Sequence, residues 1–153
     1  MIVYLTFFKP KKAPYRVYCM MGDGECAEGS VWEAMQFSSH YKLDNLCAII
    51  DCNRLGQSEA TALGHQMEVY RKRGEAFGWN TLVIDGHNIE AIAKAFHEAE
   101  TTTGQPTLIV AQTFKGKNMP EQEDRDNWHG KPMNKEQCAS IVKHLQVRFF
   151  QLS

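Results

Sequence analysis

The chain has 153 residues, 43% of them hydrophobic and 23% charged, which is typical of one globular domain with a real core. Its 17 basic and 18 acidic residues give a formal net charge of −1, so it has no general electrostatic attraction to nucleic acid or to an anionic membrane. We therefore predict neither as a partner.

The N-terminus and the cysteines bear on the cellular compartment. Met1–Phe8 is apolar and the basic stretch Lys9–Lys12 follows it, the reverse of the order in a secretory signal, and the run is too short to cross a bilayer. The five cysteines are odd in number and form no Cys-x-x-Cys pair, which favours buried free thiols in a reducing compartment over a zinc site. We expect no export signal and a cytoplasmic protein.

Two apolar runs, Val17–Met21 and Leu46–Ile50, predict β-strands with a helix between them. The first run stops at Gly22-Asp23-Gly24, where two glycines would let the backbone turn and a ligand approach closely. Ser30 and Glu33 have the spacing of a capping box and predict the start of the helix. A crossover helix makes the two strands parallel.

Strands and helices alternate through the next part of the chain. After a polar loop over Gln57–Gly64, apolar residues at helical spacing predict a helix that ends at Gly78. Strands are predicted over 81–84 and 107–111, with a helix over 89–101 between them. The alternation predicts an α/β fold, an open, mostly parallel sheet flanked by helices, which binds ligands outside the carboxyl ends of its strands.

A charged loop, Thr113–Pro132, is expected to leave the same edge of the sheet. It carries Lys115 and His129, which could reach a phosphate or a sugar hydroxyl, although a charged loop is most often only solvated. Asn134 and Gln137 have the spacing of a second capping pair, and apolar residues at helical spacing predict a last helix after them.

The most informative feature is a pair of polar residues that follow the first two strands. Asp23 follows the first strand and Asn53 follows the second, so both fall on the carboxyl edge of a parallel sheet. A carboxylate and an amide oxygen suit a hard cation such as Mg²⁺ or Ca²⁺, which would in turn bind a diphosphate. In isolation, Gly-Asp-Gly would more often be a turn and the asparagine a cap, but their spacing across a strand-helix-strand unit favours the cation site.

These residues resemble the thiamine diphosphate-binding motif, which starts with Gly-Asp-Gly and finishes with an asparagine about thirty residues later. Further along, the chain contains in order the segments Gly-Asp-Gly-Glu and Glu-Gly-Ser-Val-Trp-Glu-Ala, Lys-Leu-Asp-Asn-Leu, Asn-Arg-Leu-Gly-Gln, Thr-Phe-Lys-Gly and Trp-His-Gly-Lys-Pro. Together these segments resemble animal-type transketolase or a transketolase-like protein. Other thiamine enzymes share the cation motif, namely pyruvate dehydrogenase-type subunits, deoxyxylulose phosphate synthase and dihydroxyacetone synthase, of which the last is the hardest to separate.

The resemblance implies a thiamine diphosphate-binding fold and a set of ligands. Asp23, Asn53 and the backbone carbonyl of Leu55 would hold the cation, Mg²⁺ or Ca²⁺, that bridges to the cofactor diphosphate. Gly24 would let its backbone approach the phosphates, and Gln57 would lie beside them.

The resemblance also implies residues at the reacting end of the site. Lys115 and His129 would bind the cofactor end, and His129 would also take part in catalysis. Glu28 matches an acidic residue that in the family lies near the dimer interface and links two active sites, so we assign it a catalytic role as well.

The implied function is transketolase-type transfer of a two-carbon ketol unit from a ketose phosphate to an aldose phosphate, in the pentose phosphate pathway and by a homodimer. We divide the chain into a divergent segment 1–14, a partial diphosphate-binding domain 15–147 and a divergent tail 148–153. Because the family chain is several times longer, we expect the isolated chain to be inactive. The alternative is a non-catalytic module that binds cofactor or a full-length partner.

Overall fold

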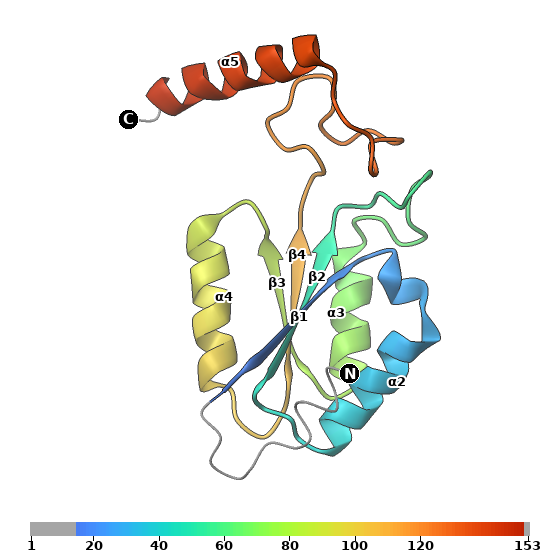
Figure 1. Cartoon of the computed structure of the whole chain (residues 1–153). Coiled ribbons are helices and arrows are strands. Elements are labelled where there is room, and N and C mark those ends of the chain that lie inside the picture. The colour runs from blue at the N-terminus through green and yellow to red at the C-terminus, as the bar shows by residue number, and fades with distance from the viewer. Residues whose placement is uncertain (1–14, 152–153) are drawn as a thin grey trace.

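The structure, a computed structural model, describes residues 15–151. The segment 1–14, predicted to diverge from the family, and residues 152–153 of the predicted tail lie outside the described residues. Within the described part, four strands form a parallel sheet in the order β1-β2-β4-β3 (Figure 1). The strands are β1 (Val17–Gly22), β2 (Leu46–Cys52), β3 (Asn80–Asp85) and β4 (Thr107–Gln112).

The helices follow the strands in alternation, as the sequence predicted. They are a short 3-10 turn η1 (Glu25–Ala27) and the α-helices α2 (Gly29–His40), α3 (Met67–Ala76), α4 (Ile89–Thr101) and α5 (Lys135–Gln151). In the described residues no helix is both long and apolar enough to span a membrane.

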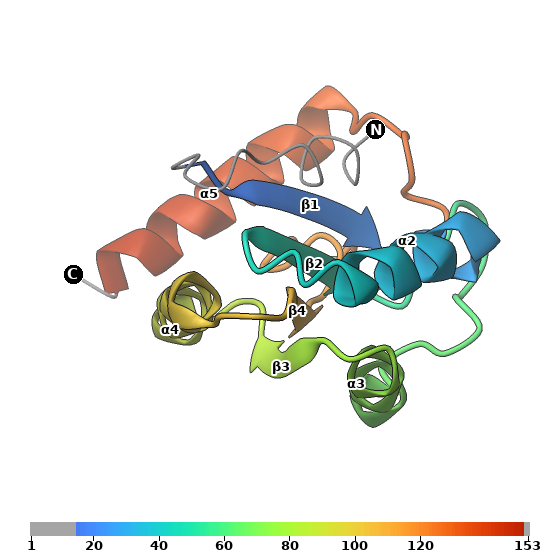
Figure 2. The same cartoon turned by 90° about the horizontal axis from the view of Figure 1, so that it is seen from below.

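Helices cover both faces of the sheet, as a parallel sheet requires. Figure 2 shows α2 and α3 on one side of the strands and α4 on the other. The larger apolar core lies on the α2 and α3 side and includes Met35, Tyr70 and Trp79, whereas a smaller one on the α4 side includes Ala95 and Ala99. The α5 helix lies past the carboxyl ends of the strands (Figure 1).

The N-terminus of α2 differs from the prediction. Glu28, in an extended conformation, is the N-cap, and its carbonyl accepts a 3.2 Å hydrogen bond from the Val31 N–H. Ser30 lies inside the first turn, and no side chain caps the helix. The predicted capping box of Ser30 and Glu33 is therefore wrong, because the chain enters the helix two residues earlier through η1.

The second capping pair is confirmed. The Gln137 N–H donates to Asn134 Oδ1 at 2.8 Å, and the Asn134 N–H donates to Gln137 Oε1 at 3.1 Å. This reciprocal pair satisfies two N–H groups at the start of α5. The helix then continues to Gln151, so residues 148–151 of the predicted divergent tail are helical.

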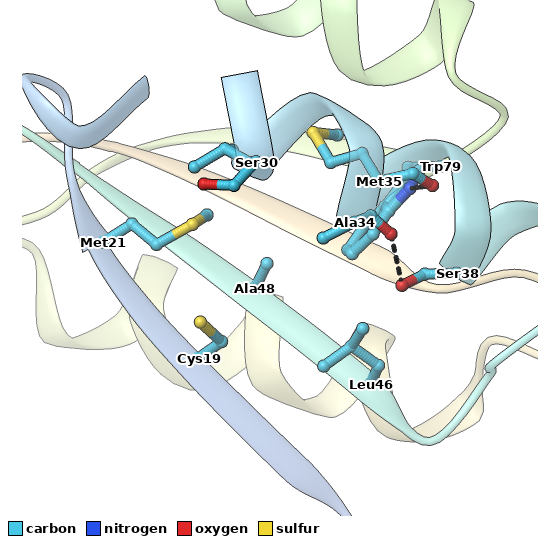
Figure 3. Close-up of a pocket in the computed structure, with 10 residues that line it drawn as sticks. Cys19, Met21, Ser30, Ala34, Met35, Ser38, Leu46, Ala48 and Trp79 are labelled. Atoms are coloured by element: carbon cyan, nitrogen blue, oxygen red, sulfur yellow. Dashed lines mark hydrogen bonds between the residues drawn. The ribbon is translucent and has the colours of Figure 1, made fainter. Parts of the chain in front are cut away.

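An apolar cavity of about 240 Å³ lies between α2 and the strands β1 and β2 (Figure 3). Two of its polar side chains already have partners, since the Ser38 hydroxyl donates to the Ala34 carbonyl at 2.7 Å and the Trp79 indole donates to the Met35 carbonyl at 3.0 Å. The cavity therefore offers little to a charged cofactor.

Candidate functional site

The structure brings the two predicted strand ends together. In the pairing of β1 with β2, Gly22 lies opposite Asp51, and the Asp23 N–H donates to the Asp51 carbonyl at 3.2 Å. The Arg54 N–H, next to Asn53 in sequence, donates to Asp23 Oδ2 at 2.9 Å. The prediction that Asp23 and Asn53 share one edge of the sheet is confirmed.

The Asp23 carboxylate is buried, with 4% of its surface exposed, and is held by three donors. Its Oδ2 accepts the Arg54 N–H and the Thr61 hydroxyl, the latter at 2.7 Å. Its Oδ1 accepts the N–H of Gly24 at 3.0 Å. These bonds compensate for desolvation and fix the orientation of the carboxylate.

The Asn53 amide is oriented in the same way. Its Nδ2 donates to Asp51 Oδ2 at 3.0 Å, and its Oδ1 accepts the Leu55 N–H at 3.1 Å. Asp51 is itself held, because the Thr113 hydroxyl at the end of β4 donates to Asp51 Oδ1. The amide oxygen of Asn53 keeps one acceptor position for another ligand.

The third predicted oxygen, the Leu55 carbonyl, accepts no hydrogen bond from any described residue. Three oxygens of the type that hard cations prefer therefore keep open positions on consecutive strand ends. No group of three or more His, Cys, Asp or Glu side chains in residues 15–151 could hold a metal ion. The donor set present, one carboxylate, one amide and one carbonyl, fits Mg²⁺ or Ca²⁺.

A small hairpin over Arg54–Thr61 replaces the start of the predicted polar loop. Leu55 and Ala60 form a bridge, the Thr61 N–H donates to the Arg54 carbonyl at 2.9 Å, and the Gly56 N–H donates to the Glu59 carbonyl at 2.8 Å. The hairpin carries the Thr61 hydroxyl to Asp23.

Two functional residues were missed by the sequence analysis. Asp51 could have been found, because it stands two residues before Asn53 in a strand and so points to the same side. Thr61 has no such signal, since its position depends on the shape of the hairpin.

The predicted turn after β1 is confirmed. The chain turns at residues 23–24 and continues into η1, although neither Gly22 nor Gly24 has a positive φ. The left-handed residue of the site is Arg54, with φ of 60°. A Cβ on Gly24 would meet only Thr61 Cγ2, at an ordinary contact distance of 3.6 Å.

The other predicted site residues make no hydrogen bond or ion pair with this cluster in the described part of the chain. Glu28 and Gln57 are exposed, at the start of α2 and in the hairpin turn, and in the loop after β4 Lys115 is half-buried and His129 is exposed. Among residues 15–151, no hydrogen bond or ion pair joins these four side chains to Asp23 or Asn53.

Other contacts tie the loop after β4 to the site. The Arg54 guanidinium pairs with Asp124 Oδ2 of the loop at 2.6 Å. Within the loop itself, Lys117 pairs with Glu123 at 2.7 Å. His65, in the segment before α3, contacts the Thr113 carbonyl at 3.0 Å through Nε2. The hairpin and the loop are therefore held against one edge of the sheet.

Two buried cysteines, Cys26 and Cys52, lie near Asp23. Burial and the nearby carboxylates of Asp23 and Glu25 raise the pKa of Cys26 to about 11. Burial, followed by the charge of Asp23, also raises the pKa of Cys52. Both thiols are therefore protonated at neutral pH and act as small apolar residues under Asp23.

Comparisons with known proteins identify the family of the chain. A family model described as the thiamine diphosphate-binding domain of transketolase matches residues 9–149. The chain is similar to transketolase-like protein 2 of Mus musculus, with 57% identity over 137 residues, and to transketolase of Homo sapiens, with 55% identity over 134 residues. These alignments cover 90% and 88% of this chain.

Solved structures show the same fold. Transketolase from Campylobacter jejuni matches 92% of this chain with a TM-score of 0.79 and 30% identity. The chain spans only about a fifth of these relatives, 22% of the mouse protein, 21% of the human protein and 22% of the Campylobacter chain. The match over residues 9–149 nevertheless shows that this chain belongs to the transketolase family, within its thiamine diphosphate-binding domain.

Proposed function

We propose that this chain supplies the cation and diphosphate half-site of a transketolase-type enzyme, which moves a two-carbon ketol unit from a ketose phosphate to an aldose phosphate. The proposal rests on three oxygens with open acceptor positions, from Asp23, Asn53 and Leu55, at the carboxyl ends of the paired strands β1 and β2. Membership in the transketolase family supports thiamine diphosphate as the ligand.

Different residues of the half-site would bind the cation and the diphosphate of the cofactor. Oδ1 of Asp23, Oδ1 of Asn53 and the Leu55 carbonyl would hold Mg²⁺ or Ca²⁺, and Gly24 would present its backbone to the diphosphate. A cation is needed because a diphosphate in a cleft carries charge that is costly to leave unpaired. When bound, the cofactor supplies the reactive carbon that carries the two-carbon unit.

The remaining roles are carried over from the family. Gln57 would lie beside the diphosphate, Lys115 and His129 would bind the cofactor and substrate end, and Glu28 would act near the interface of a homodimer. The pathway proposed is the pentose phosphate pathway, in the cytoplasm.

A second candidate is a non-catalytic module that binds the cofactor or a full-length partner. It is favoured because, among residues 15–151, no hydrogen bond or ion pair joins the side chains of Glu28, Gln57, Lys115 or His129 to Asp23 or Asn53. A chain with a cation half-site but no assembled reacting end would bind thiamine diphosphate without turning over sugar phosphates.

Calorimetric titration of the purified chain with thiamine diphosphate in Mg²⁺ tests the proposal. We expect saturable binding that is lost in Asp23→Ala. The matched control is Asp126→Ala, which removes an exposed carboxylate from the loop after β4 and should leave binding unchanged. In a coupled assay of ketol transfer we expect the same chain to be inactive, as both candidates require, and measurable activity would contradict both.

Two results would count against the half-site. Equal binding by the wild type and Asp23→Ala would place the cofactor elsewhere. A folded wild-type chain that binds no thiamine diphosphate would show that other parts of a transketolase are needed to build the site.

A further inference from the structure

Two histidines contact the backbone at the start of the loop that follows β4. His87 Nε2 lies 2.9 Å from the backbone nitrogen of Phe114, and His65 Nε2 lies 3.0 Å from the Thr113 carbonyl oxygen. Both imidazole rings also contact the Phe114 ring, His87 by stacking at an interplanar angle of 12° and His65 edge-on at 88°. The histidines thus hold two consecutive residues of the loop.

The two contacts differ in the proton that each ring must carry. A backbone N–H can only donate, so His87 Nε2 must accept and carries no proton. A backbone carbonyl can only accept, so His65 Nε2 must donate and carries one. An imidazolium has a proton on both nitrogens. Protonation therefore breaks the His87 contact, in which two N–H groups would face each other, and leaves the His65 contact intact.

The Phe114 N–H depends on His87 for its hydrogen bond. Among residues 15–151, it donates to no other acceptor. The Thr113 N–H, one residue earlier, donates instead to the Cys52 carbonyl at the end of β2, at 3.1 Å. Loss of the His87 contact would therefore free the backbone from Phe114 onward, while the residue before it stays fixed to the sheet.

The charged groups near His87 come from three elements. Asp85, at the end of β3, accepts the His87 N–H through Oδ1 at 2.9 Å, and Glu90 lies in the first turn of α4. In the loop, the hydrogen bond from Lys117 lowers the pKa of Glu123, and protonated His87 adds to this effect. Carboxylates and amines ordinarily keep their charges between about pH 5 and about pH 8, whereas imidazoles change theirs in this range.

We propose that His87 is a positioning residue, which holds the loop after β4 through the Phe114 N–H when its imidazole is neutral and releases it when the imidazole is protonated. At low pH the loop is then held at its start by His65 alone. Because the loop carries Lys115 and His129, its position bears on the cofactor end of the site. That consequence rests on the proposed function, whereas the release of the loop does not.

Hydrogen exchange of the Phe114 amide tests the inference, measured by NMR on the cofactor-free chain at about pH 5 and about pH 8. Each rate is divided by that of an unstructured peptide at the same pH, and the Thr113 amide is the internal reference. At the lower pH we expect the protection of Phe114 to be roughly three- to tenfold weaker relative to Thr113, the range of one ordinary hydrogen bond.

Two variants remove the titrating ring. His87→Phe keeps an aromatic ring but lacks an acceptor, so Phe114 should be as weakly protected at high pH as it is in the wild type at low pH. His87→Gln keeps an oxygen acceptor that does not titrate, so the protection of Phe114 should not depend on pH. His97→Gln, at an exposed histidine of α4, is the matched control and should follow the wild type.

Equal protection of Phe114 relative to Thr113 at both pH values in the wild type would overturn the inference. A wild-type pH dependence in His87→Phe would also overturn it. Either result would leave the proposed function intact, because the measurement uses no cofactor. A folded chain that binds no thiamine diphosphate would overturn the proposed function without altering the inference about the loop.

Discussion

Gly74 of α3 lies directly against Leu108 of β4, so that a Cβ on the glycine would stand 2.7 Å from Leu108 Cδ2. The Thr81 hydroxyl lies closer still to the same position. Gly74→Ala therefore forces α3 away from the sheet, and the cost of overpacking exceeds the gain in helix propensity. We expect a net loss of about 1–2 kcal/mol in the free energy of unfolding, measured by urea denaturation.

Gly29 provides the matched control. It lies in the first turn of α2, and a Cβ there would meet nothing within 4 Å. Gly29→Ala should be neutral or stabilise the chain by up to about 1 kcal/mol. Equal destabilisation by both substitutions would contradict the packing argument at Gly74.

The ion pair between Arg54 and Asp124 should protect the loop that follows β4. Asp124→Asn removes the charge and keeps the shape, and the left-handed backbone at this position, with φ of 61°, suits asparagine. Because the pair is partly exposed, global stability should change by less than about 1 kcal/mol. Chymotrypsin should nevertheless cleave after Trp128 faster than in the wild type. Asp126→Asn, a neighbouring exposed carboxylate, should leave the cleavage rate unchanged.

The buried thiols predict a loss of stability at high pH. Burial raises the pKa of Cys47 from 9.0 to about 11, so its contribution to stability is complete below about pH 9 and is lost as the pH rises towards 11. For a shift of this size the loss at about pH 10.5 is on the order of 2 kcal/mol. Cys47→Ala should therefore lose less stability than the wild type between about pH 8 and about pH 10.5, measured by the urea midpoint. Cys138→Ala, at an exposed thiol, should follow the wild type.

The free edge of β1 should cause self-association. In the described residues β1 pairs only with β2, and it exposes 72% of Met20. A charged residue on an edge strand discourages pairing with another chain, so Met20→Lys should shift the chain towards a monomer in light scattering. Ile89 is equally exposed, at 76%, but begins a helix. If Ile89→Lys reduced association as much as Met20→Lys, general hydrophobicity and not the strand edge would be responsible.

Most of the fold could be predicted because its signals are local. Apolar runs gave the four strands, and helical spacing gave the helices between them. Gly78, with φ of 79°, follows the end of α3 as its position in the pattern indicated. The start of α2 was predicted wrongly because the Ser30 and Glu33 spacing is only permissive, and the preceding turn decided where the helix begins.

The candidate site was predictable only in part, for the same reason. Asp23 and Asn53 follow strands, so a parallel sheet brings them together. Thr61 reaches Asp23 through a hairpin whose left-handed residue is an arginine, and nothing in the sequence marks such a residue as a turn. Contacts set by an irregular backbone are not visible in periodicity or composition.

The register of β1 against β2 has a consequence for how this site can change in evolution. Gly22 faces Asp51, and this pairing brings Asp23 within reach of the Arg54 N–H. Losing one residue from either strand would shift its end by about 3.3 Å and turn the next side chain to the opposite face. An insertion in the segment that joins the two strands leaves their ends opposite each other. Strand length is therefore under tighter constraint than the length of the helix between the strands.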